Sequence, residues 1–122
     1  MFKEPPKEVI DQLPPLKGVH HLLPEKRIIH LHFFFLSCHW YVAAWVENIG
    51  DDIVFYGFVN LNDTVMAEWG DFTLSQLRDV QAFTNVIDSQ SYKRIGKLPI
   101  FVEWDTYWKP RPFGEIDWRA GL

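Results

Sequence analysis

Residues 27–61 read RIIHLHFFFLSCHWYVAAWVENIGDDIVFYGFVNL, and this stretch decides the fold class. Its β-branched and aromatic residues come in runs separated by short polar breaks, which is typical of β-strands. Strands are therefore predicted over residues 28–36, 39–47 and 53–61. The break NIGDD has the Asn, Gly and Asp content of a hairpin loop, so the second and third strands are expected to be antiparallel neighbours.

The chain continues with a fourth short strand and a helix. A turn-like Asn-Asp dipeptide precedes the strand, which is predicted over residues 65–69. Thr73 followed three positions later by Gln76 has the form of a capping box, and apolar residues then recur at three-residue intervals. These features predict a helix over residues 74–83. Residues 84–96 show no clear period and are expected to form a loop or a frayed helix.

The remaining segments complete a single domain. Residues 5–13 predict a short N-terminal helix, because prolines suit its first turn and two further prolines stop the pattern. Residues 98–105 predict a last strand. We therefore expect one α+β domain, in which an antiparallel β-meander of four to five strands carries one packed helix and a short N-terminal helix. Its parts are an N-terminal helix and loop (1–26), a sheet and helix core (27–105) and an irregular tail (106–122).

The charge and the aromatic content of the chain indicate which classes of partner it can bind. The net charge is −4, so a general attraction to nucleic acid is not expected. Residues 47–79 hold seven acids against one base, whereas residues 92–111 hold five bases against two acids, which predicts one acidic and one basic side. The six tryptophans of this short chain cannot all be deeply buried, and this favours a binding surface.

The sequence favours a cytoplasmic protein. A lone cysteine, Cys38, excludes an intrachain disulfide and a zinc site built on several cysteines. The N-terminus MFKEPPKE lacks the apolar segment of a secretory signal. The longest uninterrupted apolar stretches have seven residues, whereas a membrane span needs about 18 or more. No membrane partner and no cofactor are therefore expected.

His30 and His32 are the candidate metal ligands. On a strand they share one face and lie about 6.6 to 7 Å apart, a spacing that zinc or iron sites can use. A third ligand would have to come from Glu103 or Asp105 on a neighbouring strand. The alternative is that the imidazoles face solvent or are hydrogen-bonded, because alternation puts them opposite the core. The core face of this strand would then consist of Ile29, Leu31, Phe33 and Phe35.

The catalytic candidates are Glu68, Glu103 and Asp105. They lie inside otherwise apolar strands, where an acid either faces water or has a partner. Paired carboxylates can perform acid–base or glycosidase-type chemistry, and the alternative is a salt bridge or a strand-edge position. Cys38 beside His39 is a less favoured nucleophile. Adjacent strand residues point to opposite faces, and nothing nearby would lower the pKa of the thiol.

No nucleotide-binding or standard hydrolase fingerprint is present. The seven glycines are scattered, and the chain has no Gly-x-Gly, Gly-Lys-[Ser/Thr], Gly-x-Ser-x-Gly or His-Glu-x-x-His pattern. Two basic segments with aromatic residues, 92–94 and 107–111, could stack on single-stranded nucleic acid while pairing with its backbone. Because the net charge opposes it, nucleic-acid binding is the third interpretation.

The leading hypothesis is a non-enzymatic binding module. It rests on the excess of aromatic residues and on the lack of a catalytic motif. Part-exposed rings would make the contact with the three acids as a polar rim, and the partner would be another protein or a second copy of the chain. A small hydrolase or metal-dependent enzyme is the alternative. The candidate binding residues are Trp40, Tyr56, Trp69, Trp104 and Trp108.

Several short segments resemble a known family. They are HWYVAAW (39–45), FYGFV (55–59), EWGDFTLSQL (68–77), PIFVEWD (99–105) and WKP (108–110). Their order and glycine positions within residues 28–113 resemble the bacterial family called domain of unknown function 2958, found mainly on plasmids, integrative elements and phages. The resemblance implies an accessory protein of a mobile genetic element and no known reaction. The family pattern has arginine at Trp104 and usually tyrosine at Asp71, and it does not include His30, His32 or Cys38.

Overall fold

Strands dominate residues 1–120, the part of the chain that the computed structural model describes. Two short helices, α1 (Lys7–Ile10) and α2 (Leu74–Asp79), accompany them. Short 3-10 turns lie at Leu16–Gly18, Pro24–Lys26, Phe113–Glu115 and Trp118–Ala120. The strands are β1 (Ile28–Ile29), β2 (Leu31–Phe35), β3 (Cys38–Ile49), β4 (Asp52–Leu61), β5 (Glu68–Thr73), β6 (Gln81–Ile87), β7 (Arg94–Phe101), β8 (Glu103–Trp104) and β9 (Arg111–Pro112).

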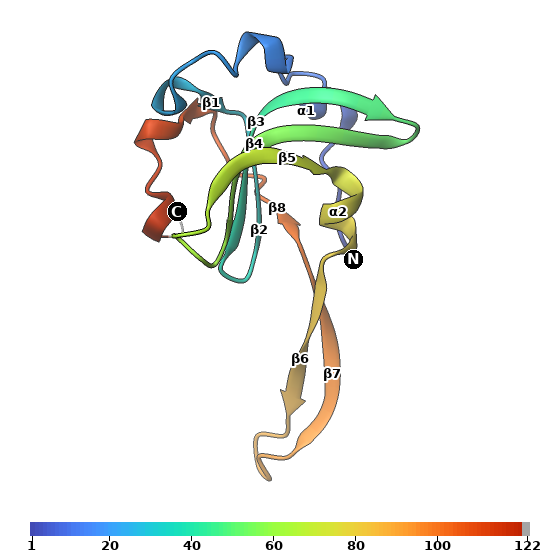
Figure 1. The fold of residues 1–122 in the computed structure, drawn as a ribbon. Coiled ribbons are helices and arrows are strands. Elements are labelled where there is room, and N and C mark those ends of the chain that lie inside the picture. Colours follow the sequence, from blue (N-terminus) through green and yellow to red (C-terminus); the bar gives the residue numbers. More distant parts are fainter. Residues whose placement is uncertain (121–122) are drawn as a thin grey trace.

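Five strands form an antiparallel sheet in the order β5-β4-β3-β2-β8 (Figure 1). Its three central strands come from residues 27–61, and β3 pairs with β4 across the predicted hairpin. Gly50 makes that turn possible, because its φ of 59° lies in the left-handed region that glycine adopts at little cost. The prediction of a single α+β domain with an antiparallel sheet is confirmed.

Both faces of this sheet are covered. The N-terminal segment and α2 pack on one face over the first cluster, which contains Phe33, Trp40 and Phe55. The C-terminal tail packs on the other face over the second cluster, which contains Tyr41 and Phe58. The predicted irregular tail is therefore part of the core. Burial on both faces explains why the central strands are apolar at nearly every position.

The helix after β5 starts as predicted and ends early. The side chain of Thr73 accepts the N–H of Gln76 at 3.1 Å, and the side chain of Gln76 accepts the N–H of Thr73 at 2.9 Å, so the capping box is confirmed. The helix ends at Asp79, and Val80 is already extended, with φ −70° and ψ 121°. The helix predicted over residues 74–83 was therefore wrong in its last turn.

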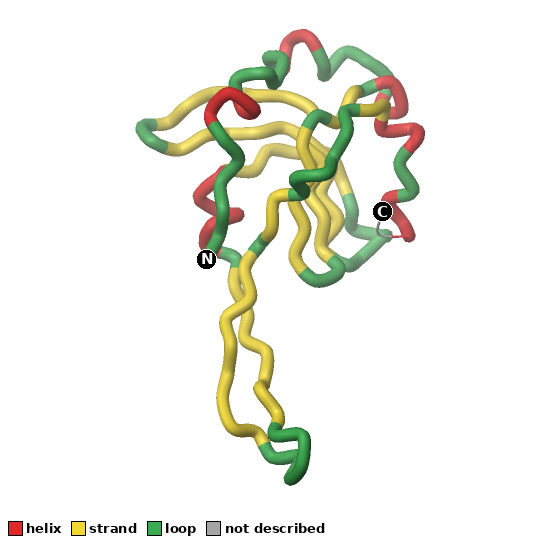
Figure 2. The backbone as a smooth tube through the Cα atoms, turned by 180° about the vertical axis from the view of Figure 1, so that it is seen from behind, coloured by secondary structure: helices red, strands yellow, loops and turns green. Residues whose placement is uncertain are grey.

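Residues 81–101 form a hairpin that includes residues 84–96, for which a loop or a frayed helix was predicted. The last predicted strand (98–105) is divided at Val102, because its first part pairs in this hairpin as β7 and its second part pairs with β2 as β8. β6 and β7 pair only with each other among the described strands and project away from the other elements (Figures 1 and 2). We call residues 81–101 the arm and residues 1–80 and 102–120 the body. Strand pairing between QAFTNVI and RIGKLPIF outweighs the three-residue recurrence that had suggested a continuing helix.

Two strand boundaries also differ from the predictions. The fourth strand lies at Glu68–Thr73 and not at residues 65–69, because the carboxylate of Asp63 accepts the N–H groups of Val65 and Met66 and holds them in a turn.

The first predicted strand is broken at His30, so β1 pairs with β9 whereas β2 pairs with β3 and β8. As a result, Ile29 lies in the second cluster, while Leu31 and Phe33 lie in the first. The predicted common core face was wrong at Ile29, because alternation carries a side chain to the same face only along an unbroken strand.

Candidate functional site

The three acids predicted as catalytic candidates do not converge. β8 pairs with β2, with Glu103 opposite Phe34, so Asp105 lies close to the histidine of that strand. Glu68 lies on β5, at the opposite edge of the sheet, and both Glu68 and Glu103 are exposed. A site of paired carboxylates is therefore not formed by these residues. Asp105 alone of the three hydrogen-bonds a titratable side chain within residues 1–120.

Asp105, which directly follows β8, forms a hydrogen-bonded chain with His32 of β2 and His39 of β3. Oδ2 of Asp105 lies 2.9 Å from Nδ1 of His32, and Nε2 of His32 lies 2.9 Å from Nδ1 of His39. The two histidines are only 5% and 7% exposed. The rings of Tyr41 and Trp108 each have their centroid 5.0 Å from that of His32, so aromatic walls shield the chain from water.

Burial decides the protonation of this chain. Burial lowers the pKa of His32, although the hydrogen bond that His32 donates to Asp105 partly opposes the shift. Burial and the neighbouring His32 together lower the pKa of His39. A neutral imidazole donates from one nitrogen only. Because the carboxylate accepts from Nδ1 of His32, Nε2 of His32 accepts from Nδ1 of His39. Nε2 of His39 is then left unprotonated, and His39 lines a polar pocket with Ser37, Asn60, Asp63 and Arg119.

The predicted metal pair of His30 and His32 is not formed. His30 lies outside β2, and the imidazole that contacts His32 comes from His39. Two nitrogens bound to one zinc ion lie about 3.3 Å apart, whereas Nε2 of His32 and Nδ1 of His39 lie 2.9 Å apart, which is a hydrogen-bond distance. Within residues 1–120, no group of three or more His, Cys, Asp or Glu side chains could hold a metal ion. Of the two alternatives to a metal site, the hydrogen-bonded one holds for His32, which does not face solvent because the tail and Trp108 cover this face.

Cys38 has the environment of a structural thiol. It is half-buried at the start of β3 and packs against the first cluster, on the face opposite His39. Burial raises the pKa of the thiol, which lowers the fraction of thiolate available for attack. A thiolate paired with the adjacent imidazole is therefore not supported.

The rings predicted to contact a partner are largely used inside the body. Trp40 is 6% exposed in the first cluster, so its predicted part-exposure was wrong. Tyr56 and Trp69 stack on each other with centroids 5.7 Å apart. They also hold the buried guanidinium of Arg27, which lies 4.5 Å from the Trp69 ring and donates to the Tyr56 hydroxyl at 3.1 Å.

The last two predicted rings lie near the edge strand β8. Trp108 is half-buried and donates from Nε1 to the carbonyl of Ile29 at 2.9 Å, with the guanidinium of Arg111 4.0 Å above its ring. Trp104 is half-buried and packs against the first cluster. The five rings thus lie on different parts of the body, and they do not form one contact surface.

The arm exposes large apolar side chains, whereas the five predicted rings are buried or half-buried. For residues 84–96 the lack of a clear period predicted a loop or a frayed helix. Two strand-like runs flank the turn-rich segment DSQSYK, however, and this spacing is typical of a hairpin. At the tip, the carboxylate of Asp88 accepts the N–H of Ser91 at 2.8 Å and its hydroxyl at 2.6 Å, and these bonds lower the pKa of Asp88. The exposed apolar side chains of the arm are Phe83, Ile87, Tyr92, Ile95 and Leu98.

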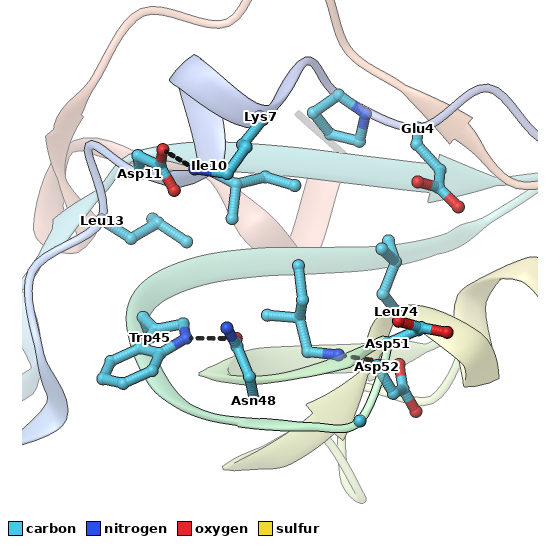
Figure 3. A pocket seen from close by; sticks show the side chains of 13 residues that line it. Glu4, Lys7, Ile10, Asp11, Leu13, Trp45, Asn48, Asp51, Asp52 and Leu74 are labelled. Carbon is cyan, nitrogen blue, oxygen red and sulfur yellow. Dashed lines mark hydrogen bonds and ion pairs between the residues drawn. The ribbon is translucent and has the colours of Figure 1, made fainter.

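An acidic pocket of about 460 Å³ lies between the N-terminal segment and the β3–β4 hairpin (Figure 3). Its lining contains four carboxylates and one cation, Lys7, which pairs with Asp11 at 2.7 Å. The indole of Trp45 also lines it and donates to Asn48 at 2.9 Å. The charged residues of the pocket are Glu4, Lys7, Asp11, Asp51 and Asp52, and the apolar ones include Ile10, Leu13, Trp45, Ile53 and Leu74.

Comparison of the chain with family models, with curated proteins and with solved structures finds no match. The resemblance to domain of unknown function 2958 therefore stays an interpretation of short segments. Among residues 1–120, no helix is long and apolar enough to cross a membrane.

Proposed function

We propose that this protein is a non-enzymatic binding module that contacts a protein partner through its arm. The observation that carries the proposal is the exposure of large apolar side chains on both strands of the arm, such as Phe83 at 60% and Leu98 at 56%. Soluble proteins seldom leave contiguous apolar surface in water unless it meets a partner. The contact surface therefore differs from the tryptophans that the sequence suggested.

The pairing of the arm supports a partner of protein type. Phe83 opposes Pro99 and Thr84 opposes Leu98, so Phe83 and Leu98 lie on opposite faces and both faces are partly apolar. A two-stranded hairpin alone is marginally stable in water, and open strand edges and uncovered faces accept further protein chains. A role as an accessory protein of a mobile genetic element is part of this proposal and is supported by the order of the short segments.

The test removes apolar surface from the arm without altering the body. The arm variant combines Phe83→Ser with Leu98→Ser, and the control combines Leu23→Ser with Val65→Ser, which are 62% and 88% exposed on the body. Self-association is measured by sedimentation, and binding of other proteins by capture from a bacterial extract. We expect complexes that the control retains and the arm variant loses. Complexes of equal amount in both variants would reject the arm as the contact.

A second candidate function is proton transfer at His39, as in a small hydrolase. The observation that favours it is the chain from Asp105 through His32, which leaves an unprotonated nitrogen of His39 at a polar pocket. Hydrolysis of activated esters is measured for the wild type, His39→Gln and Asp105→Asn. Hydrolysis that both substitutions reduce supports this candidate, and equal rates in all three proteins reject it.

A further inference from the structure

We propose that the partner of the arm is a second copy of this chain. In this dimer the two arms run antiparallel, and the basic tip of each arm lies against the acidic pocket of the other copy. The inference rests on the proposed function, since it requires the arm to be a contact surface. It goes further by naming the surface that the arm meets.

Opposite charges lie on the two surfaces. The arm carries three bases, Lys93, Arg94 and Lys97, against one acid, Asp88, whose carboxylate is occupied by Ser91. All three bases are exposed. Complementary charge of this kind steers association and sets the orientation of the partners.

The acidic pocket keeps negative charge that the body does not neutralise. Lys7 pairs with Asp11, and Arg78 pairs with Glu4. Asp51 and Asp52 make no ion pair with any described residue. The hydrogen bonds from Ser75 lower the pKa of Asp52 and keep it charged. The pocket can therefore accept cations from outside the chain.

The positions of the arm and the pocket allow the arm of each copy to reach the pocket of the other. The N-terminus and α2 both lie beside the root of the arm (Figures 1 and 2). The pocket begins in this region, where Glu4 and the first residue of α2, Leu74, line it, and it extends along the β3–β4 hairpin to Asp51 and Asp52. The arm strands are about 23 to 27 Å long, from seven and eight residues at the strand rise. Two antiparallel arms therefore bring each tip to the root of the other copy, and a twofold axis closes the dimer.

Both parts of this contact remove apolar groups from water. Along the arms, Phe83 and Ile95 of the two copies come together. At the tip, Tyr92 is 82% exposed beside the bases, and the pocket offers it an apolar floor that includes Trp45 and Ile10. An aromatic ring with a polar hydroxyl suits a pocket that is apolar at its base and charged at its rim.

Charge reversal tests the contact without changing the fold. The arm-reversed variant carries Lys93→Glu and Arg94→Glu, and the pocket-reversed variant carries Asp11→Lys and Asp51→Lys. Asp52 is left unchanged, because it holds the N–H and hydroxyl of Ser75 at the start of α2. A control carries Asp71→Lys and Glu115→Lys, two exposed acids outside the pocket lining, and has the same net charge as the pocket-reversed variant. Circular dichroism confirms that each variant is folded.

The oligomeric state is measured by sedimentation at low salt. We expect a dimer for the wild type and the control, and a dissociation constant at least about a hundredfold higher for each reversed variant. An equimolar mixture of the two reversed variants should regain the dimer, because each arm then meets a pocket of opposite charge. Added salt should weaken the wild-type dimer.

The outcomes separate this inference from the proposed function. A pocket-reversed variant that dimerises like the control overturns the pocket as the contact, and if the arm variant Phe83→Ser with Leu98→Ser is then monomeric, the arm remains a binding surface. A wild type that stays monomeric also overturns the inference, and the proposed function is then decided by the captured proteins. A dimer that survives the arm variant overturns the inference, and it overturns the proposed function as well if the arm variant also captures the same proteins as the control.

Discussion

Two hairpins of this molecule have similar residues and opposite surroundings. β3 and β4 are long apolar strands with side chains such as Tyr41 and Phe55 at 0% exposure, because the N-terminal segment covers one face and the tail covers the other. β6 and β7 are also rich in β-branched and apolar residues, yet Phe83 and Ile95 are 60% and 67% exposed. The comparison shows that the residue composition of two strands favours their pairing, whereas the stability of the hairpin depends on the segments that cover its faces.

The largest expected difference concerns one phenylalanine in each region. Phe33→Ala removes a ring at 0% exposure and should lower the free energy of unfolding by about 3 to 5 kcal/mol. Phe83→Ala on the arm should change it by no more than about 0.5 kcal/mol. Urea unfolding of both variants, at protein concentrations too low for self-association, measures the difference. Equal losses would break the comparison, since they would mean that the arm is buried within the monomer.

The next largest difference in the free energy of unfolding is expected when one glycine in each hairpin is replaced by alanine. A Cβ on Gly57 in β4 would lie 2.0 Å from the carbonyl oxygen of Tyr41, whereas a Cβ on Gly96 in β7 has no atom within 4 Å. Gly57→Ala should therefore cost about 3 kcal/mol or more, because backbone must move. Gly96→Ala should be neutral or stabilise by up to about 1 kcal/mol, since it restricts the unfolded chain. Thermal and urea unfolding check both values, and a tolerated Gly57→Ala contradicts the close approach of β3 and β4.

The junction between the two regions should show a smaller effect. Thr73→Ala removes the capping box at the start of α2, the helix that leads into the arm, and should cost about 1 kcal/mol. Thr84→Ala on the exposed arm is the matched control and should cost less than about 0.5 kcal/mol. Urea midpoints of the two variants measure the difference. A control as destabilised as Thr73→Ala would show that hydroxyls on the arm make bonds of similar value.

The smallest effect is expected from mild acidification of the body. The folded-state pKa values of His32 and His39 lie below the ordinary 6.5, so the unfolded chain takes up protons first as the pH falls. Stability should therefore be constant above about pH 7 and should decrease as the pH drops through 6.5. Urea unfolding over this range measures it.

Substitutions identify the source of this pH dependence. His39→Gln should reduce the slope, because it removes one of the two buried imidazoles. The arm contains no histidine, so Phe83→Ser with Leu98→Ser should leave the slope unchanged. A slope that survives His39→Gln in full would place the titrating group elsewhere.

The site was predictable only in its separate parts. From the sequence, Asp105 could reach His32 only if their segments were neighbours, and the β2–β8 pairing meets this condition. The sequence did not identify His39 as the second imidazole, because strand register depends on which turn joins β2 and β3. It proposed Trp40 as a contact residue because a large ring can be core or interface, and only the packing of α2 and the N-terminal segment buries it.

The arm was also not predictable from its local sequence. The three-residue apolar recurrence of residues 74–80 favoured a helix that continues to residue 83, and the lack of a clear period in residues 84–96 favoured a loop or a frayed helix. Pairing with β7, in which Phe83 lies opposite Pro99 sixteen positions further along the chain, overrides that preference. A contact between distant residues does not show in a local window of sequence.

The sequence by itself determined that residues 27–61 form strands, that β3 and β4 form an antiparallel hairpin and that α2 starts after Thr73, because these features depend on side-chain type, turn chemistry and capping over a few residues. The tertiary structure decided which faces are covered, which imidazoles meet and where the arm leaves the body. Those features depend on segments far apart in the chain, such as the tail over Tyr41 and the pairing of β2 with β8. Burial of a side chain is a property of what packs against it, and the same ring can therefore be core in the body and contact surface on the arm.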